Sequence, residues 1–188
     1  MINQLVYQAI CENWVFSDDD FYYNFDDWVQ DKNKILFIIG LSGSGKTTLG
    51  KKLVDKYNGT LISIDDIWMP ILRDYKQKTG KKTPDMTEDE FAKIDDIVEE
   101  KIKLLLKSKF KNKTVIEGMY ISYDNPKEQS IVIKGSSYFR SFYQALQRDY
   151  DKFSKKGASR FLDHYWHYLK MSKKHQHMID NLKNYLKG

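Results

Sequence analysis

The run ILFIIGLSGSGKTTLG, residues 35–50, constrains the fold of this chain more than any other feature of its sequence. Gly40 to Thr47 follows the pattern G-x-x-x-x-G-K-[ST], in which a glycine-rich loop connects a buried strand to a helix. An apolar run precedes the loop and an amphipathic pattern follows it, so strand, loop and helix stand in the required order. A glycine- and serine-rich loop with a chance lysine is the weaker interpretation.

The residue types in this loop suit a bound phosphate chain. Gly43 and Gly45 permit positive φ, so that successive backbone N–H groups can converge on phosphate oxygens beside the start of a helix. Lys46 would bridge the β- and γ-phosphates of a nucleotide, and the Thr47 hydroxyl would ligate Mg²⁺. We therefore expect ATP or GTP, with Mg²⁺, as the ligand. The expected binding residues are Gly40, Ser42, Gly43, Ser44, Gly45, Lys46, Thr47 and Thr48.

The length and composition of the chain indicate one soluble globular domain. Its 188 residues suffice for a substantial core. Its one cysteine, Cys11, has no partner for an intramolecular disulfide, and neither a signal peptide nor an apolar run of membrane-spanning length is visible. We expect a cytoplasmic protein with no membrane partner, in a compartment that supplies ATP and Mg²⁺.

The net charge of +5 conceals two ends of opposite sign. Residues 1–31 hold seven acidic residues and no lysine or arginine, whereas residues 152–188 hold nine basic residues against two aspartates. The favoured interpretation is an acidic, aromatic N-terminal extension over 1–31 whose rings dock on a P-loop domain over 32–188, both charged faces being solvated. The alternative is a basic C-terminal surface that attracts nucleic acid.

Apolar periodicity and helix breakers predict alternating strands and helices. Strands are expected at 35–39, 60–64, 113–117 and 130–134, and helices at 2–12, 46–57, 87–108, 138–153 and 159–186, the last with a break near Met171. A polar loop over 79–90 should lead into a capped helix. This order predicts an α/β fold: a parallel sheet of four or five strands, with helices on both faces and ligands beyond the carboxyl ends of the strands.

Charged residues follow three of the predicted strands at that edge. Asp65 and Asp66 follow the second strand, Glu117 ends the third, and Lys134 ends the fourth. Because the carboxyl ends of parallel strands meet at one edge, acidic groups should surround the phosphate loop.

The segments IIGLSGSGKTT, ISIDD and VIEG, in this order, resemble the P-loop nucleoside and nucleotide kinase group, especially the uridine-kinase-like and phage-type small kinases. The resemblance covers about residues 34–160 and implies a kinase fold with a lid near 148–160. It also implies that Asp65 deprotonates the acceptor hydroxyl and that Glu117 lies near Mg²⁺, directly or through water. Arg148 and Arg160 would flank the lid as an arginine pair. No strand is expected after the lid, because residues 161–186 read as helix throughout.

Each of these residues also has a structural interpretation. Asp65 is preferred as the base because the first residue after the strand should point towards the loop; otherwise it would cap the next helix, a role that also suits Asp66. Glu117 could be a buried carboxylate paired with a core hydroxyl, although Gly118 beside it indicates a close backbone approach. Arg148 could pair with an aspartate neighbour instead.

The remaining ionisable residues carry weaker signals. Arg73 could grip the acceptor, but a solvated arginine explains it more simply. No carboxylate or cysteine completes a metal-binding set around the histidines, so no metal is expected there. These histidines are His164, His167, His175 and His177.

Three functions fit the sequence. The leading one is a Mg·ATP-dependent phosphotransferase whose acceptor is a small hydroxyl or phosphate compound, with a nucleoside or nucleotide favoured. The second is a kinase acting on a polynucleotide or another polyanion through the basic C-terminal segment, with activity that falls steeply as salt rises. The third is a nucleotide-dependent switch that hydrolyses ATP slowly and binds a protein partner through its N-terminal segment.

Overall fold

A computed structural model describes residues 20–107, 112–118, 125–135, 141 and 158–188, and over 158–170 only the backbone. The predicted helices 2–12 and, apart from Ser141, 138–153 lie outside these residues. The greater part of the expected lid, with Arg148, lies outside them too.

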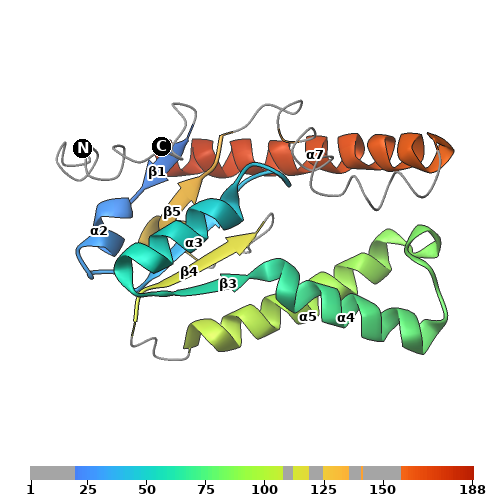
Figure 1. Cartoon of the computed structure of the whole chain (residues 1–188), viewed down its shortest axis with the longest axis horizontal. Helices are drawn as coiled ribbons and strands as arrows, with labels where there is room; N and C mark the ends of the chain where they lie inside the picture. The colour runs from blue at the N-terminus through green and yellow to red at the C-terminus, as the bar shows by residue number, and fades with distance from the viewer. Residues whose placement is uncertain (1–19, 108–111, 119–124, 136–140, 142–157) are drawn as a thin grey trace.

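A five-stranded sheet forms the centre of the described structure, with the strand order β1-β5-β2-β4-β3 (Figure 1). Its members are β1 (Phe21–Tyr23), β2 (Ile35–Ile39), β3 (Thr60–Ser63), β4 (Thr114–Gly118) and β5 (Ser130–Ile133). The last four are parallel, whereas β1 pairs with β5 in the antiparallel direction. The predicted parallel sheet is confirmed, and its fifth strand comes from the N-terminal segment.

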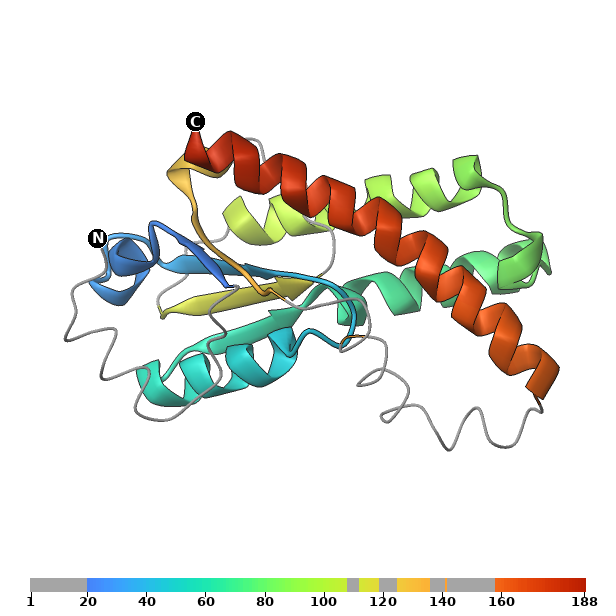
Figure 2. The same ribbon diagram turned by 90° about the horizontal axis from the view of Figure 1, so that it is seen from above.

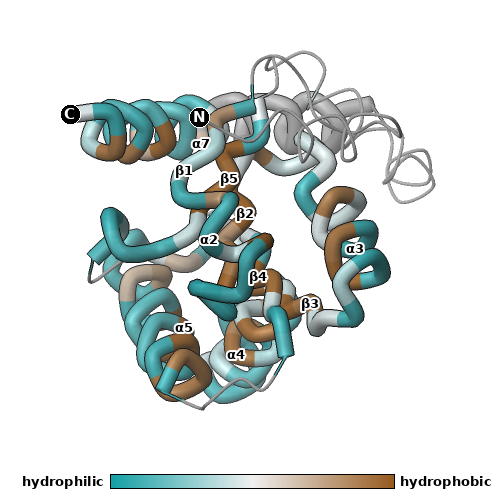
Figure 3. The backbone as a smooth tube through the Cα atoms, turned by 90° about the vertical axis from the view of Figure 1, so that its left-hand side faces the viewer, coloured by the Kyte–Doolittle hydropathy of each residue, from teal (hydrophilic) through white to brown (hydrophobic). Residues whose placement is uncertain are grey.

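Alternate residues of each strand face the two sides of the sheet, and both sides are apolar. On one side the core holds Leu36 and Ile38 of β2 together with residues of α2 (Phe25–Val29) and α3 (Lys46–Tyr57). On the other it holds Phe37 and Ile39 together with residues of α4 (Ile64–Thr79), α5 (Glu88–Lys107) and α7 (Ala158–Lys187). Figure 3 shows the apolar strands lying between α3 on one side and α5 on the other. Burial on both faces explains why the strand sequences are continuous apolar runs.

The N-terminal segment from Asp20 onwards is part of this body. Trp28 of α2 is fully buried and Phe25 is 3% exposed, so aromatic rings do dock this segment on the sheet. Lys113, just before β4, donates hydrogen bonds to the carbonyls of Trp28 and Val29. Residues on both sides of the predicted boundary between 31 and 32 therefore belong to the same sheet and pack in the clusters on its two faces.

Helices α4 and α5 form a hairpin that extends beyond the carboxyl ends of the strands (Figure 1). Helix α4 is absent from the helices predicted above, and it contains Pro70, which has no N–H to donate to the Asp66 carbonyl. A short 3-10 turn, η1 (Thr83–Asp85), connects the two helices. Thr87 and Glu90 then exchange hydrogen bonds as a capping box at the start of α5, which confirms the predicted capped helix.

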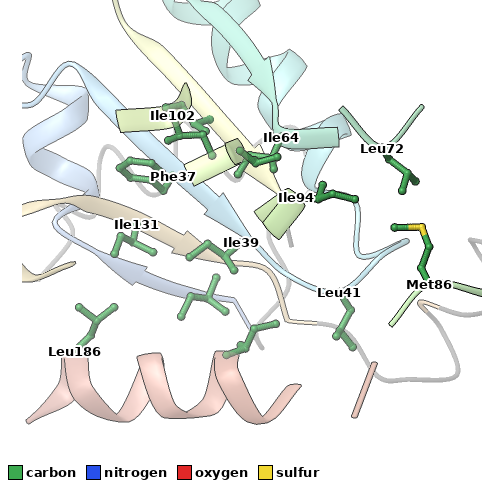
Figure 4. Close-up of a cluster of buried hydrophobic side chains, with 14 residues drawn as sticks. Phe37, Ile39, Leu41, Ile64, Leu72, Met86, Ile94, Ile102, Ile131 and Leu186 are labelled. Carbon is green, nitrogen blue, oxygen red and sulfur yellow. The ribbon is translucent and has the colours of Figure 1, made fainter. Parts of the chain in front are cut away.

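Helix α7 runs without interruption for 30 residues, so the predicted break near Met171 is wrong. Its C-terminal part packs on the sheet, where Leu186 points towards the strands in Figure 4. A second 3-10 turn, η2 (Pro126–Glu128), precedes β5. Among the described residues, no helix has both the length and the apolar character that crossing a bilayer would require.

Candidate nucleotide and catalytic site

The loop between β2 and α3 has the backbone that a phosphate-binding loop needs. Gly43 and Gly45 have φ angles of 81° and 89°, in the region that favours glycine, and Gly45 is the N-cap of α3. Gly40 is needed because the space beside it is too small for a side chain. A Cβ there would lie 2.7 Å from Ser44 Oγ and 3.0 Å from Lys134 Cβ. The three glycines of the motif thus permit the turn of the loop and its close contact with the end of β5.

Lys46 folds back over the loop rather than extending into solvent. Its Nζ donates a hydrogen bond of 2.8 Å to the Leu41 carbonyl, and the residue is 9% exposed. Ser44 Oγ is buried nearby without a hydrogen-bond partner among the described residues. An ammonium group and a hydroxyl held inside a loop at a helix N-terminus are suited to phosphate oxygens.

Thr47 and Glu117 meet at the end of the sheet. The Thr47 hydroxyl donates a hydrogen bond of 3.1 Å to Glu117 Oε1, and Glu117 is 4% exposed. Glu117 lies on β4, the strand between β2 and β3, with Ile38 and Ser63 as its neighbours across the sheet. The sequence allowed Glu117 to be either a site residue or a buried carboxylate paired with a hydroxyl. Both descriptions apply, because the hydroxyl that pairs with this carboxylate is that of Thr47 in the phosphate loop.

These oxygen donors fit Mg²⁺, which takes one or two protein ligands beside nucleotide phosphates and keeps several waters. Thr47 Oγ1 and Glu117 Oε1 are the two groups that would hold it. The described residues contain no cluster of three or more His, Cys, Asp and Glu side chains suited to a metal held by the protein alone.

Asp65 and Asp66 lie in the first turn of α4 and are exposed. The N-cap of this helix is Ser63, so the interpretation of either aspartate as the cap residue is wrong. A Cβ on Gly118 would come within 2.7 Å of the Ile64 side chain, which confirms the expected close approach there. This contact fixes the start of α4 against the end of β4. Asp65 is thereby two residues beyond Ser63, the sheet neighbour of Glu117.

Two carboxylates of the hairpin accept hydrogen bonds that link its parts. Trp68 Nε1 donates a hydrogen bond of 3.0 Å to Asp95 Oδ1, and partial burial raises the pKa of Asp95. Nearer the tip, hydrogen bonds from Lys81, the Thr87 backbone and Tyr75 lower the pKa of Glu90 to about 2. The Asp95 contact links α4 to α5, and the Glu90 contacts tie α4 and the segment just after it to the start of α5.

Of the three arginines considered as site residues, the structure describes the side chain of Arg73 alone. Arg148 lies outside the described residues, and Arg160 lies in the first turn of α7 with only its backbone described. Arg73 Nε donates to the Met69 carbonyl of its own helix at 3.3 Å, which agrees with the solvated interpretation. The arginine pair across the lid stays a prediction.

A buried ion pair near the phosphate loop could not be predicted from local sequence patterns, because its two residues lie far apart in the chain. Lys134 Nζ and Asp20 Oδ2 form an ion pair of 2.6 Å in which both side chains are at most 4% exposed. The Asp20 carboxylate also accepts a hydrogen bond of 2.8 Å from the Gly135 backbone. The Lys134 backbone in turn donates to the Ile39 carbonyl at 2.7 Å. The acidic segment is therefore tied to the residue that packs against Gly40.

Comparison with known protein families agrees with this geometry. Residues 35–121, from β2 to just beyond β4, match the family described as AAA domain. The matched segment includes the phosphate loop, Asp65 and Glu117. No curated protein matches the chain. The phosphate loop of the matched segment and the order of the parallel strands show that the chain has a P-loop NTPase fold.

Proposed function

We propose that the protein is a Mg²⁺-dependent phosphotransferase that moves the γ-phosphate of ATP, or of GTP, to a small hydroxyl or phosphate acceptor. A nucleoside or a nucleotide is the favoured acceptor. The observation that supports the proposal most is the hydrogen bond from Thr47 to Glu117, which puts a hydroxyl and a buried carboxylate together beside a phosphate loop.

Each residue of the site would have a definite task. Lys46 would leave the Leu41 carbonyl for the β- and γ-phosphates, an exchange between two oxygen acceptors that keeps the ammonium hydrogen bonded. The N–H groups at the start of α3 would hold the same phosphate chain. When bound, Mg²⁺ would neutralise charge on the phosphate oxygens, and Thr47 and Glu117 would hold it in place.

The acceptor would approach from the side of α4. Asp65 is exposed at the start of that helix, next to the end of β4, where a carboxylate could take the proton of the attacking hydroxyl. Phosphoryl transfer is catalysed mainly by positioning and by charge stabilisation, so the remaining need is a cation on the γ-phosphate. Arg148 and Arg160 are the candidates for that task.

The direct test offers γ-labelled ATP and Mg²⁺ with pooled nucleosides, nucleotides, sugars and short oligonucleotides. The expected result is label in a nucleoside or nucleotide product, with little release of phosphate when the acceptor is omitted. Lys46→Ala should abolish transfer, whereas Lys51→Ala, an exposed lysine on the same helix, should not.

Two other outcomes would contradict the proposal in different ways. Label in oligonucleotides alone, in an amount that falls steeply with salt, would indicate a polynucleotide kinase. Phosphate release that no acceptor accelerates would indicate a slow ATPase switch.

A further inference from the structure

The inner face of α7 changes character along its length. The residues on this face recur at intervals of three and four, as one side of a helix requires. From the C-terminal end they are Leu186, Leu182, Ile179, His175 and Ser172. The first three pack with the core cluster on the sheet, whereas the last two are polar although they are just as buried, at 9% and 3% exposed.

The change occurs just N-terminal to the part of α7 that packs on the sheet. In Figures 1 and 2 the helix runs past the connection between β2 and α3 and then extends beyond the sheet on the same side of the molecule as the hairpin. Electrostatics agree with this placement, since the charge of Lys46 acts on the His175 ring. The charge of Lys174 also reaches Asp95 of α5. The charge of the loop lysine therefore reaches the buried ring of His175.

The imidazole of His175 has an unused hydrogen-bonding atom. Its Nδ1 is buried and has no hydrogen-bond partner among the described residues. Burial, followed by the positive charges of Lys174 and Lys46, lowers the pKa of this histidine. A neutral imidazole offers one N–H donor and one acceptor, and buried polar atoms nearly always have a partner. A ligand atom that hydrogen bonds to Nδ1 would supply the partner that this buried nitrogen lacks among the described residues.

We propose that His175 is a further binding residue of the nucleotide site, and that its Nδ1 hydrogen bonds to a phosphate oxygen of the nucleotide held by Lys46. The proposal rests on the nucleotide-binding half of the proposed function and not on the identity of the acceptor. A phosphate chain beside Lys46 would reverse the local field, because its negative charge would outweigh that of the lysine. The same ring that is kept neutral without ligand would then be favoured as a donor to the phosphate.

The binding test uses inorganic tripolyphosphate with Mg²⁺ as the probe, so that no base or sugar contact contributes. Titration calorimetry should show binding to His175→Leu weakened about tenfold, the effect of one lost hydrogen bond to a charged group. His175→Asn, whose amide nitrogen can take the place of Nδ1, should lose about threefold or less. The matched control is His177→Leu, an exposed histidine on the same helix, which should bind as the wild type does.

A spectroscopic test on the wild-type protein distinguishes contact from a structural role. The ring resonance of His175, assigned by its absence from the His175→Asn spectrum, should shift when tripolyphosphate saturates the protein, and its pKa should rise. The ring resonance of His177 should stay in place.

Unaltered His175 resonances in a saturated protein, or tight binding to His175→Leu, would overturn the inference while leaving the kinase proposal intact. Failure of wild-type protein to bind both tripolyphosphate and a non-hydrolysable ATP analogue would overturn the inference and the proposed function together.

Discussion

Thr47 Oγ1 donates a hydrogen bond to Glu117 Oε1 at 3.1 Å, although 70 residues separate the two along the chain. The contact joins the first turn of α3 to the end of β4, one of the two inner strands of the parallel group, so a side chain of the phosphate loop is hydrogen bonded to a side chain of the sheet. Such an arrangement is expected where an ion and a phosphate chain must be held at once, because both residues present oxygen atoms to the same place.

Glu117→Gln should raise the Mg²⁺ concentration needed for half-maximal activity. The amide is nearly isosteric and can still accept the Thr47 hydrogen bond, so the fold should persist while the charge that attracts the ion is lost. We expect a loss in metal affinity of about 10–100-fold, the range for partners around a metal site. Activity measured against Mg²⁺ concentration checks this, with the exposed Glu100→Gln as control. An unchanged Mg²⁺ dependence would show that Glu117 is only a structural partner of Thr47.

Lys46→Ala should remove turnover and leave the fold intact. The Lys46 ammonium donates to the Leu41 carbonyl, whereas Leu49 and Leu53 pack α3 on the sheet, so that packing should stay unchanged. Circular dichroism and thermal unfolding would report the fold, and the acceptor assay would report turnover. Wild-type turnover in this variant would be incompatible with a phosphate-binding role for the loop.

Asp65→Asn should keep nucleotide affinity and lower transfer by about 10²–10⁴-fold, the usual contribution of a general base. Asp66→Asn is the matched control, since both aspartates are exposed in the same turn of α4 and neither is its N-cap. Calorimetry with an ATP analogue and the transfer assay separate binding from catalysis. The opposite pattern, in which only Asp66→Asn loses transfer, would assign the base to Asp66.

Arg148→Lys and Arg160→Lys should each lower the maximal rate much more than nucleotide affinity. A guanidinium matches the planar spread of charge on the transferred phosphoryl group better than an ammonium does. Hydrogen exchange in residues 149–160 should slow only when nucleotide and acceptor are both bound, as expected for a closing lid. If neither substitution changes the rate, the lid arginines have no part in transfer.

Local patterns in the sequence predicted the phosphate loop and the parallel strands. β2 and α3 have the predicted bounds, and β3, β4 and β5 differ by about one residue. These elements are set by burial on both sheet faces and by the glycines of one motif, which are features of neighbouring residues. Their order then predicted where Glu117 would lie, because the carboxyl ends of parallel strands share an edge.

The elements that were missed depend on distant partners. β1 is a strand of three residues inside an acidic segment, and it forms through its pairing with β5, more than 100 residues away. α4 contains a proline that argues against a helix, yet packing of Ile64 and Leu72 on the core holds it in place. The position of His175 in the sequence fits the apolar spacing of the buried face of α7. Spacing within one helix cannot show which distant segment lies opposite that face.

The ion pair of Asp20 and Lys134 leads to the last prediction, because it is buried and spans 114 residues. Asp20→Ala would leave the Lys134 ammonium without this charge partner, and the Gly135 N–H without its acceptor. Breaking a buried pair from one side costs about 3–5 kcal/mol, so urea unfolding should show a loss of that size. Asp27→Ala, which breaks an exposed pair with Lys32, should cost about 0–1 kcal/mol. Because Lys134 packs against Gly40, the Asp20 variant should also bind tripolyphosphate more weakly even where it is fully folded. Stability and binding equal to those of the Asp27 variant would mean that the acidic segment holds neither the sheet edge nor the loop.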